Sequence, residues 1–595
     1  MSEEQTLRPD RPSSPFDGAA SRARSQRIRR TRDLLACGFL PGSLAGFQLA
    51  GLLFFLNPHV PFEWPSAARG FLFFALLLGL AAMVLVVVLT GARARTARRL
   101  LPILLTAALL IAALGFWVHA SYFGFYLPPG INARLLKAAV WLTLAAVLCF
   151  YTLVLHRLRR RPIGRRSRAL FALMALASVY VVVERREAFK PRVDPDPRAT
   201  AFENERRPQL LVVGLETASL DVVLPLAQQG RLPFFRRVLD GGIQSRLTSL
   251  SPTRRSPLWT TLATGKYPYK HGVVGERLYE GYLGRRQGPW LSLLPLGLES
   301  WGDWVSSREA DAGDVRVLTL WRILARLGVS TGVVGWPLTS PVSEELTAVL
   351  PDRFFAGDSE ITVHPAEMAE RARLFRTRLG ELDPETVSRF GVRPPQPVLD
   401  ALVDDLWRED LAQFLLDGDP KTDALFLLLP GLRELSLRYF GGFSAVQFRG
   451  LQDPESVDAA RLLSAYYEHL DASLARLWAS MEGPKMMVIV SAHGVHEAPL
   501  WEEARRVVLR RQPPTRGSVH EGPDGLLLAI GEGIVTSGSA LDARLVDLTP
   551  TLLYSLGLPV ARDLDGSVLT GVFENSFMAR QPLNFVPSYE TLPSR

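Results

Sequence analysis

Five long apolar runs are concentrated in the first 185 residues of this 595-residue chain, and no comparable run follows them. The first four are long enough to cross a hydrocarbon core of ~30 Å as helices. The fifth is short, so it either spans with little tilt or lies at the interface. The runs cover roughly residues 34–57, 69–91, 100–126, 135–156 and 169–183. The sequence therefore predicts a basic tail at 1–33 and a transmembrane region of about five helices at 34–185.

Arginines are unevenly distributed among the loops that join these runs. They precede the first run and cluster at 93–99 and 157–168, whereas the remaining loops hold only Arg69, Arg134 and Lys137. Alternate loops are therefore predicted to be cytoplasmic by the positive-inside rule. In a bacterium this places the chain in the inner membrane, with its N-terminus in the cytoplasm and everything after residue 185 in the periplasm or outside the cell.

The net charge of +9 does not indicate a nucleic-acid partner. Residues 1–185 hold 23 Lys and Arg against 7 Asp and Glu, whereas the remainder holds 45 against 52. The basic character therefore belongs to the membrane region, where it orients helices and faces the lipid bilayer. The spans contain almost no ionisable residue, and His119 lies beside Trp117 and Tyr122 in a predicted aromatic belt. We interpret this region as an anchor rather than a transport pathway.

From Gln209 the pattern changes to short β-rich runs that alternate with amphipathic helices, which is typical of a doubly wound α/β sheet. We predict a linker at 186–208, an α/β domain at 209–574 and a C-terminal tail at 575–595. Ligands gather at the carboxyl ends of the strands in such sheets. The clearest strand candidates are residues 209–215, 331–336, 424–429, 486–491 and 525–530.

Six segments of this domain form a recognisable series along the chain. The first two are LVVGLE, at the end of the first predicted strand, and SPTRRSPLWTTLATGKYPYKHGVVG. The other four are WRILARLGVSTGVVGWPLTSP, IVSAHGV, VHEGPDGLLLAIGEG and VDLTPTLLYSLGLP. In this order they resemble the alkaline phosphatase superfamily in its type I phosphodiesterase/nucleotide pyrophosphatase branch. The resemblance implies an alkaline-phosphatase-like fold and a transferase in which two zinc-like ions activate a Ser or Thr nucleophile.

The first carboxylate and the nucleophile depart from the pattern that this family implies. Glu216 stands where the family carries aspartate, and its extra methylene shifts the carboxylate by over ~1 Å. Arg255 occupies the nucleophile position, and arginine stays protonated, so it cannot attack. Ser256 is one residue away and could substitute only if the loop changes register.

The remaining ligand positions are also altered. Arg433 and Leu437 replace the aspartate and histidine that follow one strand, and Ala492 replaces the next aspartate. His493 and His520 remain. Neither predicted metal set reaches the three or four ligands that hold zinc tightly. We therefore expect no metal cofactor, or zinc or another divalent ion if the protein is active.

Three fates of this site stay open. Arg433 and Glu216 could form a buried pair, because a strand-end carboxylate left alone would be costly. Arg255 and Arg433 could instead bind a phosphate- or sulfate-bearing ligand, which suits arginine forks. A rebuilt catalytic site could use one metal with Ser256 as nucleophile, its ligands drawn from His493, His496, Glu497, His520 and Glu521. His271 is predicted to be structural.

These observations predict a membrane-anchored pseudo-hydrolase that binds an anionic ligand or another envelope or membrane protein. The alternatives are an active metal-dependent phosphodiesterase, phosphatase or sulfatase with rearranged ligands, and a structural envelope component. An insert at Tyr279–Asp314, with Trp290, Trp301 and Trp304, could cap the site or dock a partner, or its tryptophans could form a local core.

Overall fold

The chain divides into two compact units. The first holds Met1–Phe189 and Glu280–Ser306, and the second holds Lys190–Tyr279 and Ser307–Arg595. The predicted linker, except for its last two residues, and the three tryptophans of the predicted insert lie outside the described residues. The computed structural model describes residues 15–58, 64–91, 93–183, 207–280, 287–288, 306–356, 361–378, 382–418, 421–499, 502, 517–536, 538–539 and 542–590.

Among the described residues, the first unit has five helices that are long and apolar enough to cross a membrane, which confirms the predicted membrane region. The fifth run is among them, with 19 residues. The first helix begins inside the stretch predicted as a basic tail, well before the apolar run starts. The helices are α1 (Pro15–Leu56), α2 (Trp64–Thr90), α3 (Ala94–Tyr122), α4 (Pro129–Leu158) and α5 (Arg165–Val183).

Helices α1 and α2 approach each other closely at glycines. A Cβ atom added at Gly42 would collide with the carbonyl oxygen of Leu78, and one at Gly46 with that of Phe74. Small residues at a four-residue spacing let two helix backbones come together in this way. The Gly-xxx-Gly pair of the first run is therefore a helix contact within the chain.

The second unit is built on a nine-stranded sheet in the order β13-β2-β12-β9-β1-β8-β6-β7, with β14 pairing β2. Strands β9, β1, β8, β6 and β7 are mutually parallel, and β12 runs antiparallel between β9 and β2. The strands are β1 (Gln209–Leu215), β2 (Ile243–Thr248), β6 (Thr331–Val334), β7 (Ala348–Leu350), β8 (Ala424–Leu429), β9 (Lys485–Ser491), β12 (Gly525–Gly531), β13 (Gly538–Ser539) and β14 (Ala543–Arg544).

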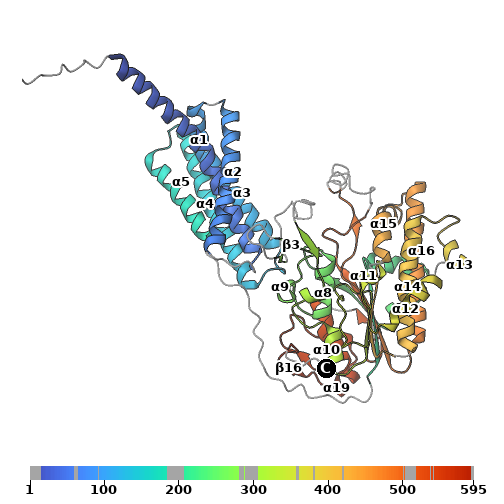
Figure 1. The fold of residues 1–595 in the computed structure, drawn as a ribbon. Coiled ribbons are helices and arrows are strands. Elements are labelled where there is room, and N and C mark those ends of the chain that lie inside the picture. Colours follow the sequence, from blue (N-terminus) through green and yellow to red (C-terminus); the bar gives the residue numbers. More distant parts are fainter. Residues whose placement is uncertain are drawn as a thin grey trace, which may run out of the picture. The chain divides into compact units, whose positions relative to one another are not determined.

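Helices cover both faces of this sheet, which confirms the predicted doubly wound α/β class. Alternate residues of β1 point to opposite faces. Leu211, Val213 and Leu215 join the main core, to which α6, α7, α14, α15 and α16 contribute. Gly214 faces the other way and leaves room for Trp259 of α8. Figure 1 shows α8 and α10 on one side of the sheet and α14 to α16 on the other.

Shorter elements complete the second unit. Its helices are α6 (Leu220–Gln228), α7 (Pro233–Gly241), α8 (Arg255–Thr264), α9 (Pro268–His271), α10 (Leu320–Arg326), α11 (Asp352–Phe355), α12 (Glu367–Arg378), α13 (Pro384–Ser388), α14 (Gln396–Asp417), α15 (Gly431–Arg449), α16 (Pro454–Ser480), α18 (Leu548–Ser555) and α19 (Asn575–Arg580). Single 3₁₀ turns are η2 (Ala312–Asp314), η3 (Leu545–Asp547) and η4 (Thr570–Val572). The minor strands are β3 (Arg277–Glu280), β4 (Gln287–Gly288), β5 (Ser307–Glu309), β10 (His496–Glu497), β11 (Gly517–Ser518), β15 (Val560–Ala561) and β16 (Phe585–Val586).

Candidate functional site

The candidate site lies at the carboxyl ends of three adjacent parallel strands. Glu216 directly follows β1, Arg433 lies in the first turn of α15 after β8, and His493 follows β9. Arg255 is the first residue of α8. Because β9, β1 and β8 are neighbours in the sheet, these four residues from distant parts of the sequence come together.

Glu216 is the centre of this cluster. It is 1% exposed, and its Oε1 accepts a hydrogen bond from Nε of Arg255 at 2.5 Å. Its Oε2 lies 3.7 Å from Nε of Arg433. The pair anticipated between Glu216 and Arg433 is thus present, but the shorter contact is made by Arg255. A buried carboxylate needs such compensation, because leaving it unpaired is costly.

Arg255 bridges Glu216 to a second carboxylate. Its Nη1 donates to Oδ2 of Asp352 at 3.0 Å. Burial opposes the charged form of Arg255, but the two carboxylates outweigh it and raise the pKa of Arg255 above its ordinary value. The side chain therefore stays a cation that is held in place by two anions. Sequence reasoning missed Asp352, whose only signal is its position at the start of a helix two residues after β7.

Arg433 is held far less firmly. Its side chain is 38% exposed, and its closest carboxylate contact among the described residues is the 3.7 Å approach to Glu216. Five N–H groups of a guanidinium can donate. Arg433 therefore keeps donors available to a ligand, whereas Arg255 uses Nε and Nη1 within the protein.

His493 is buried next to these charges. Its Nδ1 lies 2.9 Å from the carbonyl oxygen of Gly494, which can only accept, so Nδ1 carries the proton. Burial lowers the pKa of His493, and Arg433 contributes in the same direction, while Gly494 and Glu216 oppose them. The ring is therefore neutral, with a lone pair on Nε2.

His520 and the other residues of the alternative metal site do not gather around one point. His520 is exposed, and its carbonyl oxygen lies 2.7 Å from Nε2 of His496. The Nδ1 of His496 lies 2.7 Å from the carbonyl oxygen of Glu497. The Glu497 carboxylate pairs with Arg449 at 2.9 Å. Both ring nitrogens of His496 thus face backbone oxygens rather than a shared metal position.

Three further positions of the motifs hold Ser256, Ala492 and Leu437. Ser256 is 5% exposed inside α8, and Ala492 is fully buried. Leu437 lies one turn after Arg433 on α15, partly exposed. None of the three adds a carboxylate or imidazole to the site.

His271 is structural. It is fully buried, its Nε2 lies 3.0 Å from Oγ1 of Thr261, and its Nδ1 accepts from the backbone N–H of Val273 at 3.2 Å. Burial and the nearby Arg316 lower its pKa to about 3. This neutral ring ties the end of α9 back to α8, the helix that carries Arg255.

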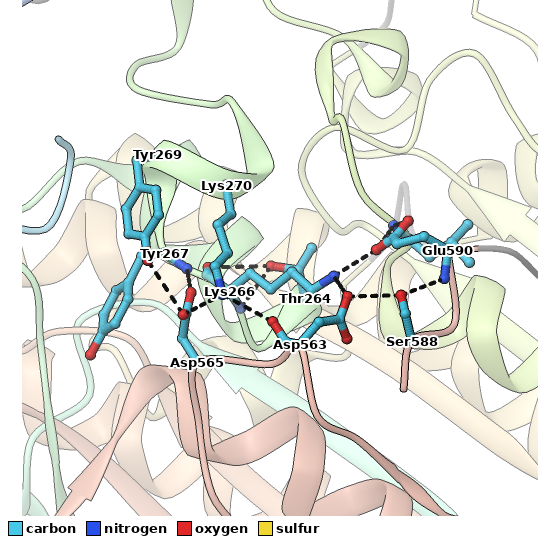
Figure 2. A network of polar contacts seen from close by, with 10 residues as sticks. Thr264, Lys266, Tyr267, Tyr269, Lys270, Asp563, Asp565, Ser588 and Glu590 are labelled. Atoms are coloured by element: carbon cyan, nitrogen blue, oxygen red, sulfur yellow. Dashed lines mark hydrogen bonds and ion pairs between the residues drawn. The ribbon is translucent and has the colours of Figure 1, made fainter. Parts of the chain in front are cut away.

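The segment between α8 and α9 is also fastened to the C-terminal region. Lys266 is 5% exposed and donates to Oδ2 of Asp563 and to Oε1 of Glu590, both at 2.7 Å. Lys270 donates to Oδ1 of Asp565 at 2.6 Å. Figure 2 shows these side chains converging from three separate segments. The stretch predicted as a C-terminal tail thus contributes to the support of the site helix.

The donor set does not fit the two-zinc site that the motifs imply. Arg255 donates to one oxygen of Glu216 and Arg433 lies 3.7 Å from the other, so a divalent cation there would lie against two guanidinium groups. Nowhere in the described parts of the chain do three or more His, Cys, Asp or Glu side chains gather so as to hold a metal ion.

Comparison with known proteins agrees with the motifs. The family model "Type I phosphodiesterase / nucleotide pyrophosphatase" matches residues 210–511. No curated protein matches the chain. Similar solved structures include murine ectonucleotide pyrophosphatase/phosphodiesterase 5 (13% identity, 61% of this chain and 98% of that chain, TM-score 0.38) and the alkaline phosphatase PafA (11%, 62% and 100%, TM-score 0.41). Phosphonoacetate hydrolase from Sinorhizobium meliloti is 16% identical, and the match covers 49% of this chain and 57% of that chain with a TM-score of 0.30. The family model covers half of the chain, and the chain therefore belongs to the type I phosphodiesterase/nucleotide pyrophosphatase family.

Proposed function

We propose that this chain is a membrane-anchored pseudo-hydrolase whose domain has given up metal-dependent hydrolysis and binds an anionic ligand instead. The family is metal-dependent. The observation that carries the proposal is the position of Arg255, which stands at the expected nucleophile position and donates to both Glu216 and Asp352. One side chain thereby removes the attacking group and supplies the positive charge that a metal would otherwise bring to Glu216.

Arg433 is the residue that we assign to the ligand. It is partly exposed and makes only a long contact to Glu216, so it can donate a bidentate pair to a phosphate or sulfate group. The two carboxylates and two guanidinium groups of this cluster balance one another, so Arg433 would attract an anion through its exposed N–H donors and not through an excess of positive charge. A second protein of the envelope that presents such a group would use the same contact.

The orientation of the chain belongs to the same proposal. Five spans with arginine-rich alternate loops support a cytoplasmic N-terminus and a domain on the far side of a bacterial inner membrane. An anionic ligand would then come from the periplasm. Cysteine labelling before Arg8 and after Glu574 in intact cells checks this orientation, and labelling of both sites from the outside would contradict it.

The first test is the metal content of the purified full-length chain in detergent. After dialysis against buffered zinc and manganese, elemental analysis should find almost no bound metal, and a chromogenic phosphodiester should not be hydrolysed. A matched variant carrying Arg255→Thr, Arg433→Asp, Leu437→His and Ala492→Asp restores the implied ligands and should gain zinc. Stoichiometric zinc in the wild type, with hydrolysis lost in Ser256→Ala, would establish the active-enzyme alternative instead.

The second test is an anion titration by calorimetry with phosphate, sulfate and a phosphodiester. Arg433→Ala should weaken binding on the order of tenfold or more, the usual effect of losing one charge-assisted bidentate contact. Arg438→Ala is the matched control, because Arg438 lies on the same helix and pairs with Glu434 at 2.7 Å. Binding that Arg433→Ala leaves unchanged would refute the assignment, and no binding of any anion would favour a structural envelope component.

A further inference from the structure

The turn between α4 and α5 concentrates positive charge at the ends of two apolar helices. It carries seven arginines within twelve residues, and every one of them is exposed: Arg157, Arg159, Arg160, Arg161, Arg165, Arg166 and Arg168. Lysine is absent from this stretch. No other loop between the spans has as many positive charges in its sequence.

The backbone of this turn is held in a defined shape. Nε2 of His156, near the end of α4, lies 2.8 Å from Oγ of Ser167 on α5, and this contact fastens one helix to the other. The N–H of Arg161 donates to the carbonyl oxygen of His156 at 3.1 Å. Arg160 adopts a left-handed conformation with φ of 52°. The arginines therefore project from an ordered loop.

No acidic residue compensates this charge locally. The sequence contains no Asp or Glu between Glu63 and Glu184. Among the residues that the structure describes, none of the seven arginines forms an ion pair with a carboxylate. Arg165, Arg166 and Arg168 also occupy the first turn of α5, where the helix dipole is already positive. The turn thus needs anions from outside the chain.

The surroundings of the turn select an amphiphilic anion. Leu158, between two of the arginines, is 74% exposed, and Phe150 and Tyr151 on α4 are 61% and 58% exposed. On α5, Leu173 and Leu176 are 57% and 68% exposed. Both helices therefore expose apolar side chains within the spans that adjoin the arginine-rich turn. A ligand with a phosphate head and acyl chains matches both parts.

We propose that the α4–α5 turn is a binding site for the phosphate headgroups of anionic phospholipids in the surrounding leaflet. Guanidinium groups bind phosphate oxygens in bidentate pairs, and a compact ammonium does not. Basic residues at the membrane surface attract anionic lipids and not zwitterionic ones. This proposal does not rest on the cluster of Glu216 and Arg433.

Native mass spectrometry of the full-length chain in detergent, titrated with phosphatidylglycerol or phosphatidylcholine, tests the proposal. The wild type should bind phosphatidylglycerol more tightly than phosphatidylcholine, by a factor on the order of ten or more. Two variants change Arg159, Arg160, Arg161, Arg165 and Arg166 together, to Gln or to Lys. The Gln variant should lose the preference. The Lys variant keeps the charge and the membrane orientation, and it should keep part of the preference.

Three outcomes would overturn the proposal. One is a wild type without preference for phosphatidylglycerol, and another is a Gln variant that retains it. The third is displacement of phosphatidylglycerol by inorganic phosphate at equal concentration, which would identify a site for free anions. Thermal unfolding of the Gln variant, compared with that of the Lys variant, separates loss of the site from loss of the fold.

Discussion

The contact between Arg255 and Glu216 makes a quantitative prediction about stability. Arg255→Met removes the guanidinium and leaves Glu216, 1% exposed, with only Arg433 at 3.7 Å. Breaking a buried pair by removing one partner costs ~3–5 kcal/mol, and we expect the lower end because Arg433 remains and Arg255 is 24% exposed. Glu216→Gln should cost only ~1–2 kcal/mol, because Arg255 keeps Asp352 and an amide oxygen can still accept.

The double variant distinguishes a specific pair from two unrelated effects. With Met at 255 and Gln at 216, no buried charge is left uncompensated at the end of β1. The double variant should therefore be more stable than the sum of the single effects predicts, by ~2 kcal/mol. Arg236 and Asp240 form an exposed pair, 54% and 60% exposed, and supply a control cycle. Their coupling should not exceed ~0.5 kcal/mol.

Denaturant unfolding of the full-length chain in detergent, followed by tryptophan fluorescence, measures these energies. Trp259, Trp321 and Trp336 are buried, and the first two lie edge to face against Trp336 at 5.1 and 5.6 Å, so their emission responds to unfolding of the second unit. Additivity of the two single effects to within ~0.5 kcal/mol would refute the reasoning. Stabilisation of Arg255→Met by added zinc, without effect on the wild type, would show that Arg255 excludes a metal.

Three other predictions follow from buried groups. Burial raises the pKa of Glu409 to about 7 from 4.5, so the folded state binds the extra proton and loses stability as pH rises between these values. The free energy of unfolding of Glu409→Gln, measured relative to the wild type in denaturant, should therefore rise by ~3 kcal/mol from pH 4 to pH 8. Unfolding free energies of the two proteins that change in parallel with pH would contradict this. Lys266→Met leaves two carboxylates facing each other and should cost ~2–3 kcal/mol in denaturant unfolding, with Asp563→Asn restoring part of it; an unchanged midpoint would contradict the contact. Gly46→Val should force α1 away from α2 and lower the thermal midpoint in detergent, whereas Gly130→Val, where an added Cβ meets nothing, should not.

Much of this fold was predictable because buried parallel strands have a strong sequence signal. Strands β1, β8 and β9 are covered on both faces, so they read as nearly continuous apolar runs. Strand β2 was missed because its outer positions hold Gln244, Arg246 and Thr248, and β7 because it has only three residues. The five membrane helices were predictable for the simpler reason that each must be apolar over its length.

The site was predictable in its residues but not in its pairings. Sequence order identified Glu216, Arg255, Arg433 and His493, because each directly follows a strand or begins a helix in a recognisable segment. It could not show that Arg255 lies closer to Glu216 than Arg433 does, since that depends on the angle at which α8 leaves the sheet. Asp352 carries no motif, and only the placement of β7 beside β6 brings it within reach of Arg255.

These pairings also bear on how a metal-dependent site could lose its metal and keep its fold. A carboxylate that is 1% exposed at the end of a central strand must meet a positive charge, whatever supplies it. Arg255 supplies that positive charge from within the chain. Asp352 pairs with Arg255 and Arg433 lies near Glu216, so two guanidinium groups face two carboxylates. Reverting Arg255 alone would therefore leave Glu216 short of charge and Arg433 still opposed to a cation. Under the proposed function, the path back to hydrolysis needs several simultaneous changes, and the same network that stabilises the domain keeps the site from returning to catalysis.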